Sequence, residues 1–209
     1  MKKYSKIIIP SIYVGVIGVM VVSCLLVVSG VKNFLNERKD YDYTLDKVFI
    51  KDTIPVSKNE NNMIIKPYTN DKVKVYSYFY DFEGDTKKQL DSLIYYENTY
   101  MQNTGVDYVK EDTFKVVSIL SGEVISVTDN DIVGKTVKVR HNDKLISIYQ
   151  SLGEVAVKEH DKIKQGDVIG TSGTNEINSE LKNHLHFELV INGVYVNPEK
   201  YYTKTVGEF

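Results

Sequence analysis

The chain has 209 residues, of which 26% are charged and 42% are hydrophobic, as is typical of one folded domain with an anchor or of two small domains. The formal net charge is −2 at pH 7 and the chain has no long basic run, which argues against a nucleic-acid partner. The single cysteine, Cys24, lies in an apolar N-terminal run. No disulfide can therefore form within the chain, and the folded part depends on its core.

The N-terminus has the pattern of a single membrane-spanning helix. Lys2, Lys3 and Lys6 precede an uncharged run, residues 7–31, that is rich in Ile and Val. A helix needs roughly 20 apolar residues to cross the hydrocarbon layer, and it satisfies its own backbone there. Positive charge is concentrated on the short N-terminal side. We therefore expect residues 1–6 to form a cytoplasmic tail, residues 7–31 to span the membrane, and the remainder to be extracytoplasmic.

Two other interpretations of this run stay open. A cleaved signal peptide has an apolar region of about 7–15 residues before a small-residue cleavage site, and the run here is longer. Residues 21–24, Val-Val-Ser-Cys, resemble a bacterial lipobox, but residues 25–28 continue the apolar run beyond the cysteine. The pattern therefore favours the spanning helix over a processed N-terminus.

A linker separates this run from one expected folded domain. Residues 32–66 are charged, Asn-rich and weakly periodic, which indicates a linker or stalk. We expect a domain over residues 67–202 and a short tail over residues 203–209. Within the domain, residues 73–80 alternate as in a strand, whereas residues 86–100 have apolar positions at near-helical spacing. The second pattern predicts a helix or helical turns.

From residue 114 onward the sequence predicts strand after strand. The expected strands are 114–120, 123–127, 136–140, 144–149, 168–170, 184–191 and 194–196. His141, Asn142 and Asp143 have the composition of a hairpin turn, and so does the dipeptide Asn192-Gly193. Short strands at near-regular spacing predict a mainly β domain, either a sandwich or a flattened barrel, with short helices.

The histidines divide into a pair and two isolated residues. His184 and His186 are two residues apart, so a strand places both rings on one face. Asp107 and His186 are candidate metal ligands, although a catalytic zinc site usually has three protein ligands and an open position. Packing of the histidine pair on the strand face, without a metal, is an equally good interpretation. We expect His141 and His160, which lie in polar turns, to be solvated.

Four stretches resemble the LytM-type zinc endopeptidases that cut bacterial cell-wall peptides. They are residues 103–107, 148–152, 157–172 and 184–186, and the resemblance spans about residues 65–200. It implies a LytM-like fold in which Asp107 and His186 match two zinc ligands and His184 matches a histidine that assists catalysis. Asn103 stands at the position of the first zinc-binding histidine, and Ser151 stands at the position of the other catalytic histidine.

These two exchanges predict that the peptidase activity is lost. A neutral amide oxygen is a weak zinc ligand beside imidazole and carboxylate. Without tightly bound zinc no hydroxide forms at neutral pH, and the Ser151 hydroxyl cannot replace an imidazole as a base. We therefore expect zinc to be absent or weakly bound, and Asn103, Asp107, Ser151, His184 and His186 to be vestigial positions of a protein that is not an enzyme.

A membrane span joined to a degenerate LytM domain resembles the LytM proteins that spore-forming Firmicutes anchor in the forespore membrane. Residues 76–81, 97–100 and 103–108 carry this resemblance. It implies an interaction module that meets a partner anchored in the mother-cell membrane, forms a ring-like hetero-oligomer and contributes to a channel. The alternatives are an active zinc endopeptidase, a protein that binds peptidoglycan without cutting it, and a regulator of a separate wall hydrolase.

Overall fold

The computed structural model describes residues 20, 22–29 and 63–208, and it places residues 1–45 and 46–209 in two separate compact units. Residues 20 and 22–29 are helical. No helix among the described residues has the length and apolar character needed to cross a membrane. Most of the predicted span, the predicted tail 1–6 and most of the predicted linker 32–66 lie outside the described residues. The membrane span and the domain bounds therefore stay predictions.

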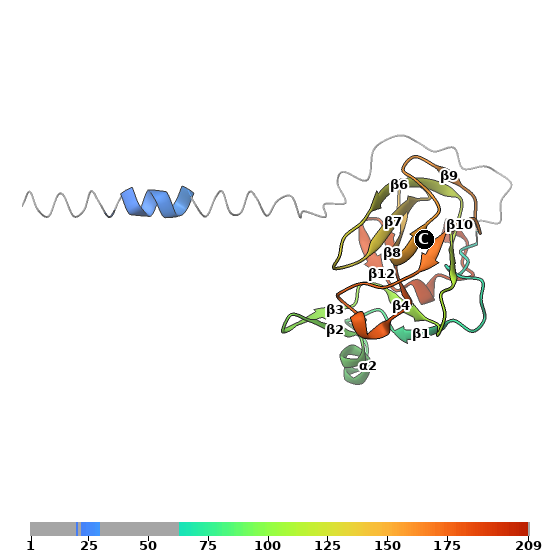
Figure 1. The fold of residues 1–209 in the computed structure, drawn as a ribbon, viewed down its shortest axis with the longest axis horizontal. Helices are drawn as coiled ribbons and strands as arrows, with labels where there is room; N and C mark the ends of the chain where they lie inside the picture. Colours follow the sequence, from blue (N-terminus) through green and yellow to red (C-terminus); the bar gives the residue numbers. More distant parts are fainter. Residues whose placement is uncertain (1–19, 21, 30–62, 209) are drawn as a thin grey trace, which may run out of the picture. The chain divides into compact units, whose positions relative to one another are not determined.

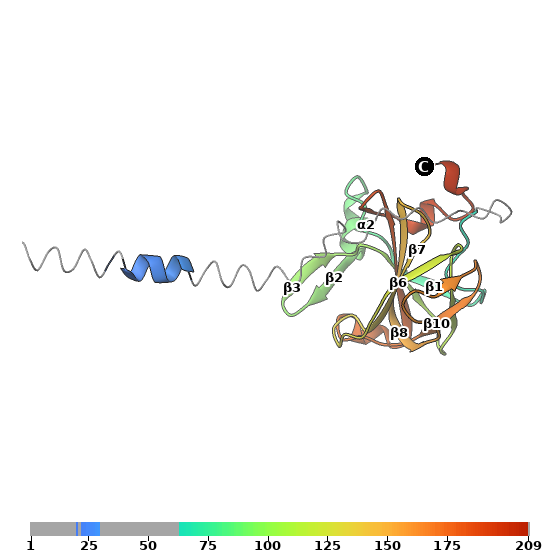
Figure 2. The same ribbon diagram turned by 90° about the horizontal axis from the view of Figure 1, so that it is seen from above.

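The second unit is built on a large antiparallel sheet with the strand order β1-β4-β11-β8-β7-β6-β9 (Figures 1 and 2). Beside this path β10 pairs with β5 and β8, and β12 pairs with β11. The strands of this sheet are β1 (Lys74–Ser77), β4 (Val106–Val109), β5 (Lys115–Val117), β6 (Gly122–Thr128), β7 (Lys135–Arg140), β8 (Leu145–Val155), β9 (Lys162–Ile163), β10 (Val168–Ser172), β11 (His184–Ile191) and β12 (Val194–Val196). The prediction of a mainly β, LytM-like domain is confirmed.

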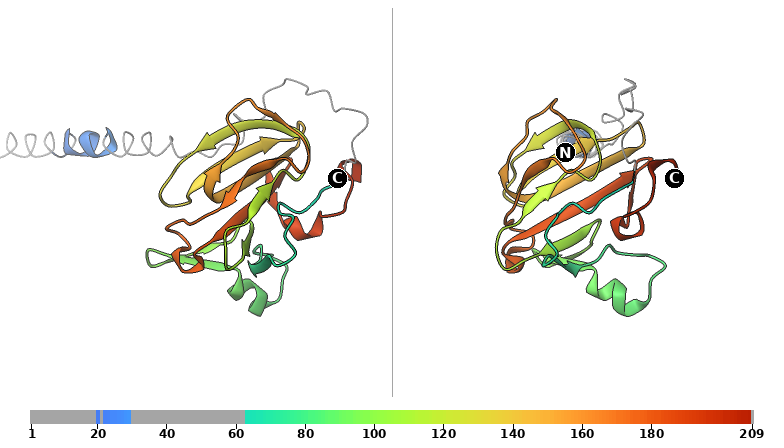
Figure 3. Two further views of the ribbon diagram at one scale, coloured as in Figure 1. Left: turned by 45° about the vertical axis from the view of Figure 1, so that its right-hand side comes forward. Right: turned by 90° about the vertical axis from the view of Figure 1, so that its right-hand side faces the viewer.

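Among the residues of this unit that the structure describes, three short 3-10 helices and one α-helix accompany the strands. They are α2 (Thr86–Asp91), η3 (Ser179–Leu181), η4 (Pro198–Lys200) and η5 (Val206–Glu208). The strands β2 (Leu93–Tyr96) and β3 (Thr99–Gln102) form a separate two-stranded sheet. We call residues 78–102, which carry α2, β2 and β3, the side module. It lies at one end of the domain, beyond β1 and β4 and opposite β6 and β9 (Figures 1 and 3).

The helix predicted over residues 86–100 is wrong in its second half. The α-helix ends at Asp91, and residues 93–102 form the β2–β3 hairpin. Glu97 and Asn98 make its turn with φ of 45° and 61°, the left-handed conformation that two-residue hairpin turns require. The Leu-Ile-Tyr-Tyr sequence of β2 also suits an extended strand better than a helix, since β-branched and aromatic side chains pack well on a pleated sheet.

The central strand β11 alternates between the core and the opposite face of the sheet. Leu185, Phe187 and Leu189 are fully buried in the main apolar cluster, while His184 and His186 point to the other face. Apolar side chains of the neighbouring strands complete the cluster; they include Val106, Tyr108, Val137, Val139, Leu145 and Tyr149. Period-two alternation therefore places the whole polar series of β11 on one face.

Polar contacts attach both ends of the described domain to this core. The hydroxyl of Tyr108 donates to Glu199 (2.6 Å) and lies 2.7 Å from the hydroxyl of Tyr202. Ile64 is buried in the core, and its backbone N–H donates to the carbonyl oxygen of Lys204. The segments before β1 and after β12 therefore hold each other against the sheet.

The prediction that His141 is solvated is wrong, whereas His160 is exposed as expected. The His141 ring lies inside the fold, with Nδ1 3.0 Å from the carbonyl oxygen of Ser121 and Nε2 2.7 Å from the hydroxyl of Ser147. Burial lowers the pKa of His141 to about 4. The polar turn sequence does not reveal this burial, because the burial is produced by β6 and β8, which pack around His141 from elsewhere in the chain.

Candidate functional site

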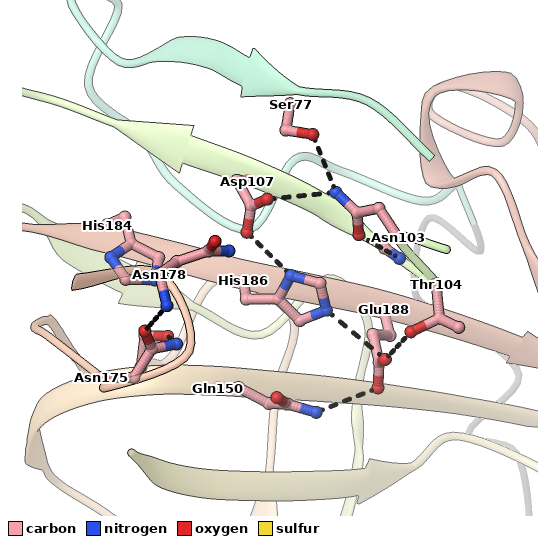
Figure 4. Close-up of polar contacts among 12 residues, drawn as sticks. Ser77, Asn103, Thr104, Asp107, Gln150, Asn175, Asn178, His184, His186 and Glu188 are labelled. Carbon is pink, nitrogen blue, oxygen red and sulfur yellow. Dashed lines mark hydrogen bonds and ion pairs between the residues drawn. The ribbon is translucent and has the colours of Figure 1, made fainter. Parts of the chain in front are cut away.

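Strands β4 and β11 bring two of the predicted site residues, Asp107 and His186, together, and β8 adds Gln150. In the antiparallel register Asp107 lies opposite His186, and His186 lies opposite Gln150. Residues that are directly opposite in neighbouring strands point to the same face. The side chains of Asp107, His186 and Gln150 therefore meet on the face of the sheet away from the main core, with Glu188 two positions further along β11 (Figure 4).

His186 lies between two carboxylates. Its Nδ1 is 2.8 Å from Oδ1 of Asp107, and its Nε2 is 3.4 Å from Oε1 of Glu188. Burial favours the neutral imidazole, but the carboxylates of Asp107 and Glu188 outweigh burial and raise the pKa of His186 to about 10. The ring is therefore an imidazolium at neutral pH, and each of its N–H groups donates a hydrogen bond to a carboxylate.

Glu188 extends the cluster toward β8 and the loop before β4. It accepts a short hydrogen bond from the hydroxyl of Thr104 and a bond of 3.2 Å from the amide of Gln150. Burial alone raises the pKa of the Glu188 carboxyl, but the bond to His186 and its positive charge bring that pKa below the ordinary value. The result is a closed polar network across three strands.

Asn103 contacts this network through its amide nitrogen. Nδ2 donates to Oδ2 of Asp107 and to the hydroxyl of Ser77, at 3.1 Å each, while Oδ1 accepts from the backbone N–H of Gly105 at 3.0 Å (Figure 4). The opposite orientation of the amide would place its oxygen against a carboxylate and its N–H₂ against another donor. Asn103 therefore presents hydrogens, not a lone pair, to Asp107.

Ser151 and His184 are not bonded to this network, and each forms a hydrogen bond with a different partner. Ser151 is buried in the left-handed region (φ 61°), and its hydroxyl accepts a bond of 2.6 Å from Nδ2 of Asn175. Nδ1 of His184 lies 2.9 Å from the carbonyl oxygen of Lys182 and so carries the ring hydrogen, and Nε2 is buried with no hydrogen-bond partner among the described residues. Burial lowers the pKa of His184, which therefore is neutral at pH 7.

The structure adds site residues that the sequence analysis missed. Glu188 could have been found, because the alternation that pairs His184 with His186 places it on the same face. Thr104 lies within the stretch 103–107, but only the fold brings its hydroxyl to Glu188. Ser77 and Asn175 could not be found, because they reach the site from segments distant in sequence. Over residues 20, 22–29 and 63–208, no three side chains of His, Cys, Asp or Glu are grouped so that they could hold a metal ion.

A depression of about 730 Å³ lies beside Ser151 and His184, between the loop that joins β6 to β7, the end of β8 and the segment that follows β10. Its rim is polar and mainly acidic, with Asp129, Asp131, Glu154, Glu176 and Lys135 among the lining residues. The ammonium of Lys135 donates to the carbonyl oxygen of Gly153 in its wall. The depression can accommodate a peptide-sized polar ligand.

The chain is similar to known cell-wall peptidases and to a sporulation protein. The model of peptidase family M23 matches residues 101–198. Stage II sporulation protein Q of Bacillus subtilis is 35% identical over 158 residues, which cover 75% of this chain and 56% of that relative, so the match spans about half of the relative's length. Peptidoglycan DD-endopeptidase ShyC of Vibrio cholerae is 34% identical over 95 residues, which cover 45% of this chain and 21% of that enzyme.

Solved structures agree with these matches. A chain in the structure of the SpoIIQ–SpoIIIAH pore-forming complex is 34% identical, with a TM-score of 0.68, and the match covers 71% of this chain and 96% of that one. A second SpoIIQ–SpoIIIAH complex contains a chain that is 35% identical with a TM-score of 0.64, covering 66% and 99%. Residues 101–198 therefore match peptidase family M23, and this chain belongs to the family of stage II sporulation protein Q.

Proposed function

We propose that this protein is a non-catalytic, membrane-anchored interaction module of sporulation. Its outer domain binds the outer domain of stage III sporulation protein AH across the space between forespore and mother cell during engulfment, and the pair contributes to a channel. The similarity over almost the whole SpoIIQ chain of the SpoIIQ–SpoIIIAH complex carries this proposal. The uncharged run at residues 7–31 supports a single span with a cytoplasmic N-terminus, in the forespore membrane.

The donor set at the family's metal position supports the loss of catalysis. Zinc bound tetrahedrally at about 2.0–2.2 Å would hold the Asp107 oxygen and the His186 nitrogen about 3.3 Å apart. These atoms lie at hydrogen-bond distance, 2.8 Å, and Asn103 presents N–H₂ where a third ligand is needed. The residues do not fit zinc, so we expect zinc to be absent or weakly bound. The hydroxyl of Ser151, engaged by Asn175, supplies no base near neutral pH.

The side module offers the surface for the partner. Large apolar side chains that are exposed to solvent are frequent there and on the adjoining strand β1: Tyr76, Tyr78, Phe82, Leu90, Tyr95 and Tyr100. Tyr95 and Tyr100 pack against each other with ring centroids 4.8 Å apart, which preorganises an aromatic anchor. β1 is also an end strand of the large sheet, where a partner strand can pair. Such a concentration of exposed apolar groups is typical of a docking site.

Mixing the two outer domains tests the proposal. Residues 46–209, combined with the outer domain of stage III sporulation protein AH, are expected to elute together from a size-exclusion column as one complex. The double change of Tyr95 and Tyr100 to Ser should weaken binding at least about tenfold, because it removes the aromatic pair. Val168→Ser, a change at an exposed apolar position outside the side module, is the matched control and should leave binding unchanged. Separate elution of the two unmodified domains would contradict the proposal.

Metal analysis tests the non-catalytic part on its own. The purified chain should contain far less than one zinc ion per molecule and should not cut wall peptides. Stoichiometric zinc together with cleavage that is abolished by His186→Ala would instead establish the alternative, a zinc endopeptidase.

The polar depression beside Ser151 favours a second candidate, a protein that holds peptidoglycan without cutting it. Retention of the metal-free protein on purified wall sacculi would support it, and Glu154→Gln and Glu176→Gln should then weaken retention. Recovery of a wall amidase from sporulating cells would indicate regulation of a separate hydrolase.

A further inference from the structure

Asn103 joins the side module to the position of the former metal site. It lies between β3 and β4 and is 1% exposed. Its backbone carbonyl oxygen accepts from the N–H of Tyr80 at 2.8 Å, and its backbone N–H donates to the carbonyl oxygen of Ser92 at 3.1 Å. One residue therefore ties the segment after β1 and the end of α2 to the exit of the β2–β3 hairpin.

The side chain of the same residue is bonded to the large sheet. Its amide nitrogen donates to Ser77 on β1 and to Asp107 on β4, and its amide oxygen accepts from Gly105 (Figure 4). Asp107 is in turn held by His186 on β11 at 2.8 Å. A continuous series of hydrogen bonds thus connects the side module, through Asn103, to the central strand of the fold.

Other attachments between the side module and the sheet are weak among the described residues. The two-stranded sheet of the module is not paired with the large sheet, and α2 buries none of its residues. Lys200 bonds Asp81 at 2.9 Å, but this ion pair is exposed, and exposed pairs contribute little. Phe79 is half-buried against the core, and the hydroxyl of Ser77 donates to the carbonyl oxygen of Asp91 over a long distance, 3.5 Å. The buried hydrogen bonds of Asn103 are therefore the polar contacts that fix the orientation of the side module on the sheet.

We propose that Asn103 is the positioning residue of the side module, so that the place where the family binds metal has become the anchor of the partner-binding surface. This inference rests on the proposed function for its biological meaning, but the attachment itself is testable without a partner. An amide is suited to this role because it donates to a carboxylate and a hydroxyl and accepts from a backbone N–H at the same time, whereas a metal-binding imidazole cannot.

Hydrogen–deuterium exchange on the full chain in detergent tests the attachment. Asn103→Asp keeps the size of the side chain, removes both donated bonds and puts a second carboxylate beside Asp107. We expect exchange of the amides in residues 78–102, with Tyr80 as the reporter, to rise at least tenfold, while exchange in residues 184–191 stays unchanged. Asn175→Asp, the same change at another buried asparagine, should leave residues 78–102 unchanged. If Asn103 had only a general structural role, its substitution would accelerate amide exchange in residues 78–102 and 184–191 together.

Two further measurements keep the outcomes distinct. If Asn103→Asp does not fold, Asn103→Ala, which removes the same two donated bonds without adding a charge beside Asp107, should still raise exchange in residues 78–102. Unchanged exchange there in each variant that folds would overturn the inference, as would acceleration across the whole domain. Affinity for the stage III sporulation protein AH outer domain should fall at least tenfold in Asn103→Asp. If the unmodified chain does not bind that domain, the proposed function fails, whereas the exchange result still decides the role of Asn103.

Discussion

His141 should make the stability of the domain depend on pH between about 6.5 and 4. Its ring is buried, and burial lowers its pKa from 6.5 to about 4. Between these two pH values His141 is protonated in the unfolded chain and stays neutral in the folded protein. The contribution of neutral His141 to the free energy of unfolding is therefore fully present above pH 6.5 and is lost as the pH falls toward 4. At about 1.4 kcal/mol per pKa unit, the difference amounts to about 3 kcal/mol.

The assay is urea unfolding of the unmodified domain and of His141→Gln at a series of pH values. Between pH 7.5 and pH 4.5 the unmodified domain should lose about 2.5 kcal/mol more than the variant, because Gln does not titrate. His186 has a raised pKa, so its stabilisation is present below pH 6.5 and is lost as the pH rises toward 10. It contributes equally to both proteins and cancels in the difference.

One result would refute the predicted pH dependence of His141. Equal pH dependence of the two proteins from pH 6.5 to pH 4.5 would mean that the folded protein accepts the proton on His141 as readily as the unfolded chain does. Burial of this ring would then not hold it in the neutral form. The chemical shifts of the His141 ring hydrogens, followed by NMR over the same pH range, would report the titration directly.

Three substitutions test other parts of the fold. Tyr108→Phe removes the hydroxyl that donates to Glu199 and should cost about 1–3 kcal/mol in thermal or urea unfolding; an unchanged midpoint would show that this contact is dispensable. Gly105→Ala places a Cβ 2.4 Å from a backbone oxygen of β11 and should destabilise the domain by about 1–3 kcal/mol or more, whereas Gly207→Ala, with open space around it, should be neutral. Asn98→Val, at φ 61°, should cost about 1–2 kcal/mol within the hairpin and accelerate amide exchange in residues 93–102; equal exchange in variant and parent would argue against the left-handed turn.

The sequence by itself determined the mainly β class, most strand positions and the degenerate nature of the family motif. Period-two alternation is a local property, so it already places His184 and His186 on one face of a strand. The same rule would have identified Glu188. The resemblance also predicts that Asn103 and Ser151 stand in place of the first zinc-binding histidine and of the other catalytic histidine, and both assignments stay predictions.

Only the tertiary structure decided what these residues do. The hairpin at residues 93–102 depends on left-handed φ values at Glu97 and Asn98, which helix-like spacing does not reveal. His141 is buried by strands that are distant in sequence. From its residue type alone, Asn103 is expected to be a weak ligand through its oxygen. The direction of its amide is set by Ser77, Asp107 and Gly105 together, and these come from different segments. Hydrogen-bond direction and burial are properties of non-local contacts, and they appear only when the strands are in register.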